Sequence, residues 1–396
     1  MKILKILSVL RNSLNNLSKI IFKNELFRKK LIIKIYNFNQ IFKKKNKESS
    51  LFDYNTVISN SKFYCTEYYK GNALYGIGKV IKEYCNYDKK ILGCIEHGVY
   101  FGDYINEKEA IKSGLPAILT YGTVRNDMLR KKKSKKLIFK IGPYIKYANQ
   151  LLTDDEIKNI KKKNGKTLLV FPTHSVDRVE TKFDYDGFIN EIKTFKEKYN
   201  FKTVLVSLYY RDIELGKNKI YEDNGFIVVS NGLKEDYDFL LRQKTFIKLS
   251  DYTISNSVGT HIGYSVALGI PHTIIKQKME YKADSKFDVK DVPNLYLESS
   301  ILQKKEVEEC FLEYSEEITK EQLQVCNKYW GVGNYKTKEQ MLELLTFLDE
   351  LSKKSNYCEE KYNNIFMNNY SYFKNKYFKI NEDLEDNMNF LNKLSN

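Results

Sequence analysis

Residues 252–275 of the chain read YTISNSVGTHIGYSVALGIPHTII, and this stretch decides the fold class. Its first residues, Tyr252–Ser255, form a short apolar run of the kind that predicts a buried strand. A helix is predicted from Thr260 to Leu268, and Gly269-Ile270-Pro271 then turns into a second predicted strand, His272–Ile275. A strand, a helix and a second strand joined by short turns are typical of a parallel α/β sheet.

The same alternation extends on both sides of this stretch. From residue 165 to 300 it predicts further strands and helices at Thr167–Phe171, Phe188–Tyr199, Thr203–Tyr209, Phe226–Ser230 and Tyr237–Leu249. From residue 51 to 150 it predicts a possible strand, a helix and three strands, at Tyr54–Ile58, Gly76–Tyr84, Lys90–Ile95, Ala117–Tyr121 and Leu137–Ile141. The last part reads as helices, at Lys304–Tyr314, Lys320–Tyr329 and Lys338–Lys353, and then as a polar tail with no evident apolar stripe beyond about residue 380.

These patterns divide the chain into four parts. We expect a basic amphipathic helical segment and linker at 1–50, a Rossmann-like domain at 51–150 and a second Rossmann-like domain at 151–300. The helices of 301–396 are expected to pack back on both domains. The predicted fold class is therefore α/β, with helical segments added at both ends.

The positive charge of the chain is concentrated at its N-terminus. The net charge is +16, and residues 1–48 hold +11 of it, through thirteen Lys and Arg against two Glu. The body therefore lacks the charge expected of a nucleic-acid-binding surface, and no nucleic-acid partner is predicted. Within this segment, apolar residues recur every three or four positions, at Ile3, Leu7, Leu10, Leu14, Leu17 and Ile21.

That spacing predicts a basic amphipathic helix, which can lie on an anionic membrane surface or pack on its own protein with its lysines in water. The lysines interrupt any apolar run approaching the roughly 20 residues that span a bilayer, and no signal-peptide cleavage site follows. Six cysteines without a Cys-x-x-Cys pair indicate a reduced compartment. The expected location is cytoplasmic, at the inner face of the cell membrane.

Candidate binding residues lie where predicted strands end, because ligands of open α/β sheets bind outside the carboxyl ends of the strands. Three of the four histidines, His97, His174 and His261, fall in or just after such loops. The sharpest motif places Ser255, Asn256, Ser257, Gly259, Thr260 and His261 between a strand and a helix. Hydroxyls and free N–H groups at a helix start predict a phosphate site, and plain helix capping is the alternative.

The arrangement over 252–275 resembles the nucleotide-sugar loop in the C-terminal half of GT-B-fold glycosyltransferases. It is also similar to the sugar-nucleotide 2-epimerases of that fold, whose Thr-x-His-Arg stretch corresponds in position to Thr173, His174 and Ser175. Gly263-Tyr264-Ser265 stands where many members carry an acidic residue that holds a ribose, and Val176-Asp177-Arg178 replaces the Arg-Glu-Asn of the epimerases. The resemblance covers about 165–280 well and 52–150 only in architecture.

The resemblance implies two Rossmann-like domains that face each other across a cleft, with a UDP-, CDP- or CMP-linked sugar held by the second. The sequences of loops such as Glu96-His97-Gly98 resemble those of bacterial proteins of capsule and surface-polysaccharide assembly. This resemblance implies a glycan or lipid-linked glycan acceptor. The implied reaction is metal-independent glycosyl transfer with no resident cofactor. An epimerase, or a membrane- or nucleic-acid-binding protein without catalysis, remains the alternative.

The resemblance also implies that the first domain holds the acceptor and a catalytic base, which an inverting transfer needs to remove the proton of the acceptor hydroxyl. His97 titrates in a useful range, and Glu96 or Asp103 could orient it or replace it. No Asp-x-Asp flanked by apolar residues predicts a metal site, and Asp154-Asp155 is interpreted as a helix cap.

Overall fold

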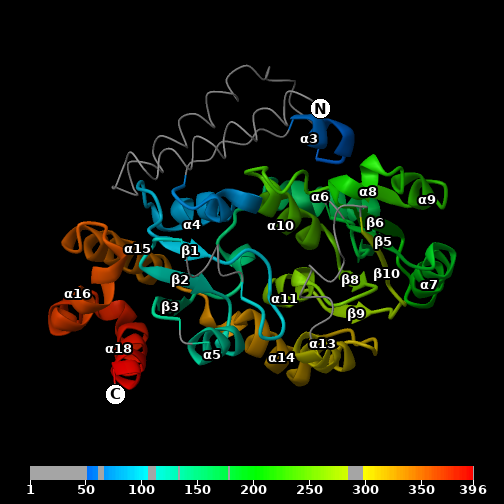
Figure 1. Ribbon diagram of the computed structural model, residues 1–396. Coiled ribbons are helices and arrows are strands. Elements are labelled where there is room, and N and C mark those ends of the chain that lie inside the picture. The colour runs from blue at the N-terminus through cyan, green and yellow to red at the C-terminus, as the bar shows by residue number, and fades with distance from the viewer. Residues whose placement is uncertain are drawn as a thin grey trace, which may run out of the picture.

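A computed structural model of the chain describes residues 51–60, 67–105, 113–132, 134–176, 179–283 and 298–395. The amphipathic segment predicted at 1–50 lies outside these residues. Two parallel sheets with helices around them make the α/β class plain (Figure 1). The predicted class is therefore confirmed, and the strands lie close to the positions that the apolar runs indicate.

The larger sheet has five parallel strands: β4 (Thr167–Phe171), β6 (Thr203–Ser207), β7 (Ile227–Val229), β8 (Tyr252–Ser255) and β9 (His272–Ile274). Their order across the sheet is β7-β6-β4-β8-β9. The chain first builds outward from β4 to one side and then returns to build on the other side with β8. The point where the direction reverses, between β4 and β8, is where open sheets of this kind bind ligands.

Burial on both faces explains why these strands read as continuous apolar runs. In β4, Leu168, Leu169 and Val170 are fully buried. Leu168 pairs with Val204 on one side and with Tyr252 on the other, which fixes the register at the centre of the sheet.

The smaller sheet has three parallel strands in the order β1-β2-β3, which are β1 (Gly93–Ile95), β2 (Ala117–Thr120) and β3 (Leu137–Lys140). Helix α4 (Ile77–Cys85) precedes the sheet and turns Ile77, Val80 and Ile81 into the core. Helix α5 (Thr123–Lys131) joins β2 to β3.

The larger sheet is flanked by α6 (Asp154–Asn164), α7 (Tyr185–Lys198), α10 (Phe239–Leu249) and α11 (Thr260–Ala267), with the short helices α8 (Tyr210–Glu214) and α9 (Asn218–Glu222) at one end. Helix α6 shows how the local sequence sets a helix start. Thr153 accepts a hydrogen bond from the backbone of Glu156, whose side chain returns to the backbone of Thr153. The cap is thus Thr153, and Asp154-Asp155 occupies the first turn, where acidic groups favour the helix dipole.

The C-terminal helices are α13 (Glu298–Cys310), α14 (Lys320–Trp330), α15 (Lys338–Lys354), α16 (Tyr362–Asn368), α17 (Tyr370–Lys376) and α18 (Asn381–Ser395). Helix α15 packs on α4, and α14 contacts both α5 and α11 (Figure 1). Gly263 of α11 allows a very close approach, because a Cβ atom there would lie 2.1 Å from a ring carbon of Trp330. The C-terminal part therefore supports the helix that starts at the predicted phosphate loop.

Two predictions about the ends of the chain are wrong. Tyr54–Ile58 belongs to helix α3 (Tyr54–Asn60), because Asp53 accepts hydrogen bonds from the backbone and side chain of Thr56 and starts a helix there. The polar tail beyond residue 380 does have an apolar stripe, since Leu384 and Leu391 of α18 are buried. Its Asn387 also bonds to both backbone groups of Ile138 in β3.

The remaining elements are short. An antiparallel pair that the sequence did not indicate joins β5 (Val179–Lys182) to β10 (Glu280–Ala283). Single turns of 3-10 helix are η3 (Tyr144–Lys146), η5 (Val332–Asn334), η6 (Glu359–Lys361) and η7 (Phe378–Ile380), whereas η1 (Lys70–Gly76) is longer and is kinked at Leu74 and Tyr75.

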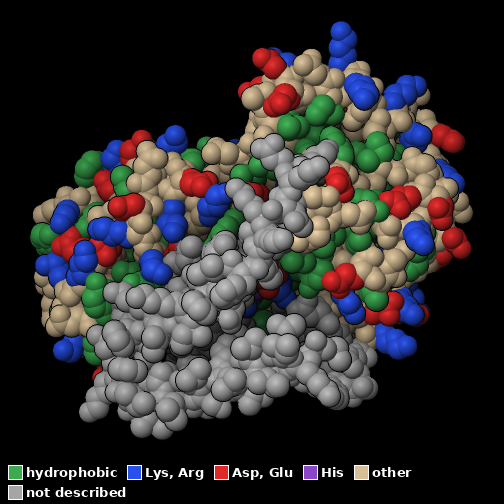
Figure 2. Space-filling model, turned by 90° about the horizontal axis from the view of Figure 1, so that it is seen from above, with side chains coloured by type: hydrophobic (Ala, Val, Ile, Leu, Met, Phe, Trp, Pro, Cys, Tyr) green, Lys and Arg blue, Asp and Glu red, His purple; other side chains and the backbone are tan. Residues whose placement is uncertain are grey.

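The surface charge of the body is mixed on the face seen in Figure 2, where Lys and Arg lie among Asp and Glu. Across the described residues, every helix is too short or too polar to cross a bilayer.

Candidate functional site

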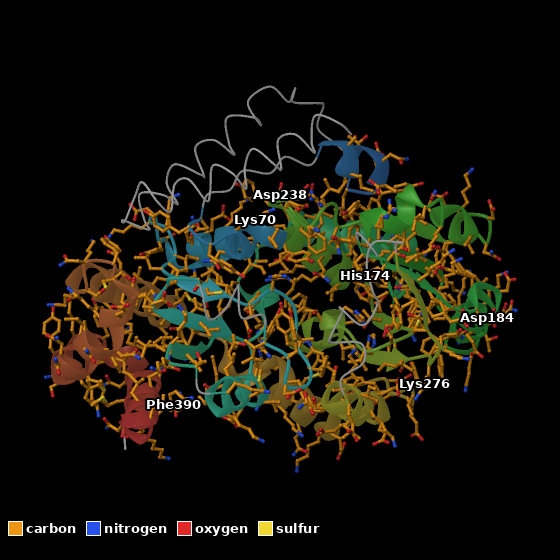
Figure 3. All side chains as sticks on the ribbon, viewed as in Figure 1. Lys70, His174, Asp184, Asp238, Lys276 and Phe390 are labelled. Atoms are coloured by element: carbon orange, nitrogen blue, oxygen red, sulfur yellow. The ribbon has the colours of Figure 1, made fainter. Side chains whose placement is uncertain are left out.

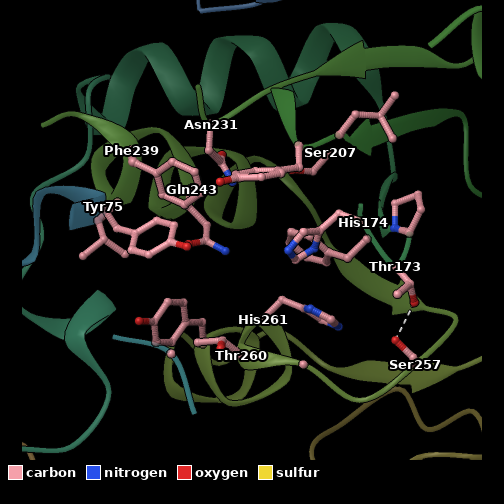
Figure 4. Close-up of a pocket in the computed structure, with 18 of the residues that line it drawn as sticks. Tyr75, Thr173, His174, Ser207, Asn231, Phe239, Gln243, Ser257, Thr260 and His261 are labelled. Carbon is pink, nitrogen blue, oxygen red and sulfur yellow. Dashed lines mark hydrogen bonds between the residues drawn. The ribbon is translucent and has the colours of Figure 1, made fainter. Parts of the chain in front are cut away.

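A pocket of about 320 Å³ opens at the carboxyl ends of the strands of the larger sheet (Figure 4). The loops after β4, β6, β7 and β8 supply Thr173, Tyr209, Asn231 and Ser257 to its wall. It lies at the reversal between β4 and β8, where the topology predicts a ligand. In the view of Figure 3, His174 lies inside the outline of the molecule, whereas Asp184 and Lys276 lie near its edge.

The loops after β4 and β8 are joined by a set of polar side chains. Asn256, which is 1% exposed, accepts hydrogen bonds through Oδ1 from the backbone N–H and the hydroxyl of Thr173, both at 2.7 Å. The hydroxyls of Thr173 and Ser257 lie 2.5 Å apart, and both residues line the pocket. Asn256 thus holds the two loops together and presents a pair of hydroxyls to a ligand.

Helix α11 begins at the pocket without a side-chain cap. Its N-cap is Gly259, and neither Ser255, Asn256 nor Ser257 caps the helix, since their side-chain oxygens bond elsewhere. The first N–H groups of a helix lack partners within the helix and favour a negative charge. Plain capping therefore does not explain the Ser-Asn-Ser run. Gly259 also leaves room for the ring of His261, because a Cβ atom there would lie 2.7 Å from Cε1 of His261.

Two histidines of the pocket are neutral at physiological pH. His261 stacks on Phe171 with ring centroids 4.8 Å apart, and burial lowers the pKa of His261 to about 3. Desolvation of its ring also lowers the pKa of His174, although the negative charge of Asp212 opposes this effect. Both rings line the pocket and therefore act as hydrogen-bonding groups rather than as cations.

The loop after β1 reaches the same pocket. Gly98 lines it with a left-handed φ of +79°, and a Cβ atom there would lie 3.8 Å from Oγ1 of Thr260. The backbone N–H of Val99 donates to that Oγ1 at 3.3 Å. His97, which precedes Gly98, is half-buried. The centroid of its ring lies 6.2 Å from that of Tyr75, which lines the pocket. The structure thus brings together two motifs that lie some 160 residues apart in the chain.

The two carboxylates proposed beside His97 do not line the pocket. Glu96 is buried and forms an ion pair with Arg125, whose Nε lies 2.8 Å from Oε2, and it accepts a further bond from Thr120. Asp103 is exposed and pairs with Lys132 at 3.0 Å. The hydrogen bond from Lys132, followed by that from Ser299, holds the pKa of Asp103 below its usual value. Glu96 and Asp103 are thus engaged elsewhere. His97 is not itself a lining residue, but it adjoins Gly98 and Tyr75, which are, and it is therefore the candidate at the pocket edge.

Three of the proposed binding residues, Ser175, Ser255 and Asn256, lie behind the pocket wall. Ser175 is fully buried and bonds to Asp212, and Lys217 donates to both residues at 3.0 Å. Ser255 bonds to Nε2 of the buried His272 at 3.0 Å. Burial holds the pKa of His272 well below its usual value, so this histidine is an uncharged part of the core. These residues position the loops and do not face the ligand.

The pocket residues that the sequence analysis missed include Tyr75, Asn231, Phe239 and Gln243. Asn231 follows a predicted strand, so its position was the available signal. The other three come from η1 and α10, whose placement over the sheet ends is a tertiary property. Tyr75 has a left-handed φ of 56°, and its backbone N–H bonds to the carbonyl of Lys234. Its ring meets Phe239 edge to face at 4.9 Å.

Within the described ranges, no three His, Cys, Asp or Glu side chains are grouped so as to hold a metal ion. Comparison of the chain with protein-family models, with curated proteins and with solved structures found no match, so its function is argued from the geometry of the site.

Proposed function

We propose that the protein is a glycosyltransferase that moves a sugar from a nucleotide-activated donor to a bacterial surface polysaccharide or a lipid-linked acceptor. One observation carries the proposal: the His97 loop meets the uncapped start of α11 at a pocket on the reversal point of a doubly wound sheet. A transferase needs an anion site for the leaving nucleotide and a proton acceptor beside it.

The same contact favours a GT-B arrangement. The carboxyl end of β1, in the smaller sheet, and those of β4 and β8, in the larger sheet, lead into loops at one pocket. We therefore keep the division into Rossmann-like domains at 51–150 and 151–300, with acceptor and donor on opposite sides of the cleft between them. The basic segment at 1–50 would bring this cleft to the anionic inner face of the membrane.

In this proposal each group has a separate task. Thr173, Ser257, Thr260 and the start of α11 bind the phosphate of the donor, and the neutral rings of His174 and His261 donate N–H groups to it. The acceptor oxygen bonds to the anomeric carbon while the bond from that carbon to the phosphate oxygen breaks. His97 takes the proton of the acceptor hydroxyl, and the nucleotide leaves with the electron pair of the broken bond.

The epimerase alternative has less support. Such an enzyme moves a proton on the sugar ring and needs carboxylates beside it, yet no Asp or Glu is present among the described residues that line the pocket. The buried pairing of Glu96 with Arg125 leaves that carboxylate with a structural task instead.

Thermal denaturation with UDP, CDP, CMP and GDP tests the proposal. A nucleotide at 100 times its Kd should stabilise the protein by about 2.7 kcal/mol. Ser257→Ala should reduce that shift. Ser59→Ala, which removes an exposed hydroxyl of α3 outside the pocket, should leave it unchanged. If none of the four nucleotides stabilises the wild-type protein, the donor site is wrong.

A further inference from the structure

The pocket has two chemically different ends. Thr173 and Ser257 lie at one end, and Tyr75, Phe239, Gln243 and Asn231 gather at the other, with His174, His261 and Thr260 between them (Figure 4). The first end suits an anion. The second combines aromatic rings with two primary amides, which suits a planar ring that carries its own hydrogen-bonding edge.

The amides are built into the wall. Asn231 is 7% exposed and follows β7, and its backbone carbonyl accepts a hydrogen bond from Nε of Arg242 at 2.9 Å, which ties this loop to α10. Gln243, the next residue of α10, is 9% exposed and lines the pocket beside it (Figure 4). Both side chains are therefore largely enclosed by the protein.

The side-chain oxygen of Asn231 lacks a hydrogen-bond partner. This Oδ1 atom is buried without a donor among the described residues. A buried acceptor left unpaired is costly, and at a pocket wall a ligand that donates a hydrogen bond can remove this cost. A primary amide accepts through oxygen and donates through nitrogen, so its best partner presents a donor and an acceptor side by side.

Two aromatic rings, those of Tyr75 and Phe239, line the same end of the pocket. Tyr75 and Phe239 meet edge to face at 4.9 Å, and the backbone of Tyr75 is kept in a left-handed conformation that side chains rarely adopt. Strained residues cluster at ligand sites, where the surrounding structure holds them. Here the strain places an aromatic wall next to the two amides.

We propose that this amide and aromatic end is the selective subsite of the pocket, and that Asn231 and Gln243 bind the hydrogen-bonding edge of a nucleobase that carries an N–H donor and an acceptor side by side. The inference rests on the proposed function, because it takes the ligand to be a nucleotide. The N–H of the base pairs with Oδ1 of Asn231, and its neighbouring acceptor takes an amide N–H. The phosphate then extends past Thr260 toward Thr173 and Ser257 (Figure 4).

Calorimetry with UDP, CDP, GDP and ribose 5-phosphate on the full chain tests this assignment. The wild-type protein should bind one of the three nucleotides more tightly than the other two and more tightly than ribose 5-phosphate, and Asn231→Ala should weaken that nucleotide by about 5- to 150-fold, the range for a bidentate amide–base pair. Gln243→Leu provides a second variant if Asn231→Ala melts early. Ser257→Ala is the matched control, and it should weaken all nucleotides by a similar factor.

The outcomes separate the two proposals. If no nucleotide binds the wild-type protein, the proposed donor site fails and this inference fails with it. If nucleotides bind, but Asn231→Ala and Gln243→Leu both leave the ratio of UDP, CDP and GDP affinities unchanged, the base lies elsewhere and the donor site stands. Loss of ribose 5-phosphate binding in Asn231→Ala would also overturn the assignment, because that probe carries no base.

Discussion

The backbone N–H of Val99 donates to Oγ1 of Thr260 at 3.3 Å, and this bond joins a loop of the smaller sheet to the first residue of α11. Thr260 therefore has two neighbours, the loop that carries His97 and the pocket that would hold the phosphate. Removing its hydroxyl should therefore affect both the loop that carries His97 and the binding of a phosphate in the pocket.

Replacing Thr260 by Val removes the hydroxyl but keeps the shape of the side chain. A charge-assisted hydrogen bond contributes about 1.5–3 kcal/mol, so nucleotide affinity should fall by at least tenfold. Thr260→Ser keeps the hydroxyl and should retain most of the affinity. Calorimetry with the best nucleotide decides the matter. Equal affinities for the Val and Ser variants, with normal melting, would leave Thr260 as a contact between loops only.

Glu96 tests whether a buried carboxylate here is structural. Glu96→Gln leaves Arg125 buried without its charge partner, and breaking such a pair costs about 3–5 kcal/mol. Denaturant unfolding should therefore show a large loss in the free energy of unfolding. The double variant Glu96→Leu with Arg125→Met should recover much of the loss, since both charges are removed together. A Glu96→Gln protein of full stability and no activity would return Glu96 to the list of catalytic bases.

The low pKa of His261 predicts an acid-dependent loss of stability. In the unfolded chain this imidazole takes a proton near pH 6.5, whereas burial prevents it until about pH 3. Between these values the unfolded state binds more protons than the folded state. The contribution of His261 to the free energy of unfolding is therefore fully present above pH 6.5. It falls as the pH is lowered, by at most about 1.4 kcal/mol per pH unit. His261→Phe should keep the stacking on Phe171 and show a smaller fall of Tm between pH 7 and pH 5. An unchanged pH profile would contradict the buried, neutral state.

The strands were predictable because burial on both faces marks them in the sequence. Thr167–Phe171 and Tyr252–Ser255 have the predicted bounds, and both lie in the middle of the larger sheet. Tyr54–Ile58 is as apolar as some of these strands, but Asp53 starts a helix through two hydrogen bonds to Thr56. A single local cap decided the element there, and a short apolar run could not show it.

The candidate site was predictable only in part. The carboxyl ends of parallel strands lie at the same edge of a sheet. Thr173 and Ser257, which follow two such strands, could therefore be placed together from topology alone. Which side chains turn inward could not, and Ser175 and Ser255 face buried partners behind the wall. Gln243 was beyond prediction because it depends on how α10 packs over the ends of the strands.

The charged N-terminus gives a prediction that does not involve the pocket. Deleting residues 1–45 removes most of the excess charge and the apolar stripe, so binding to anionic lipid should be lost. Co-sedimentation with anionic and with neutral liposomes measures this, and an unchanged nucleotide-induced shift in Tm serves as the control for folding. Equal sedimentation of the truncated and full chains would show that the body, or no part of the chain, carries the membrane affinity.

His97 separates catalysis from donor binding. The donor groups lie in the loops of the larger sheet, and His97 lies beyond Gly98 on the loop that faces them. His97→Ala should therefore lower turnover by about 10²–10⁴, the usual contribution of a positioned acid or base, with donor affinity nearly unchanged. His261→Ala is the matched control and should weaken donor affinity first. The wild-type rate should fall at low pH as the imidazole takes a proton, and this acid limb should be absent from the His97→Ala variant. Full turnover in His97→Ala, or an acid limb that persists in it, would assign the proton transfer to a group other than His97.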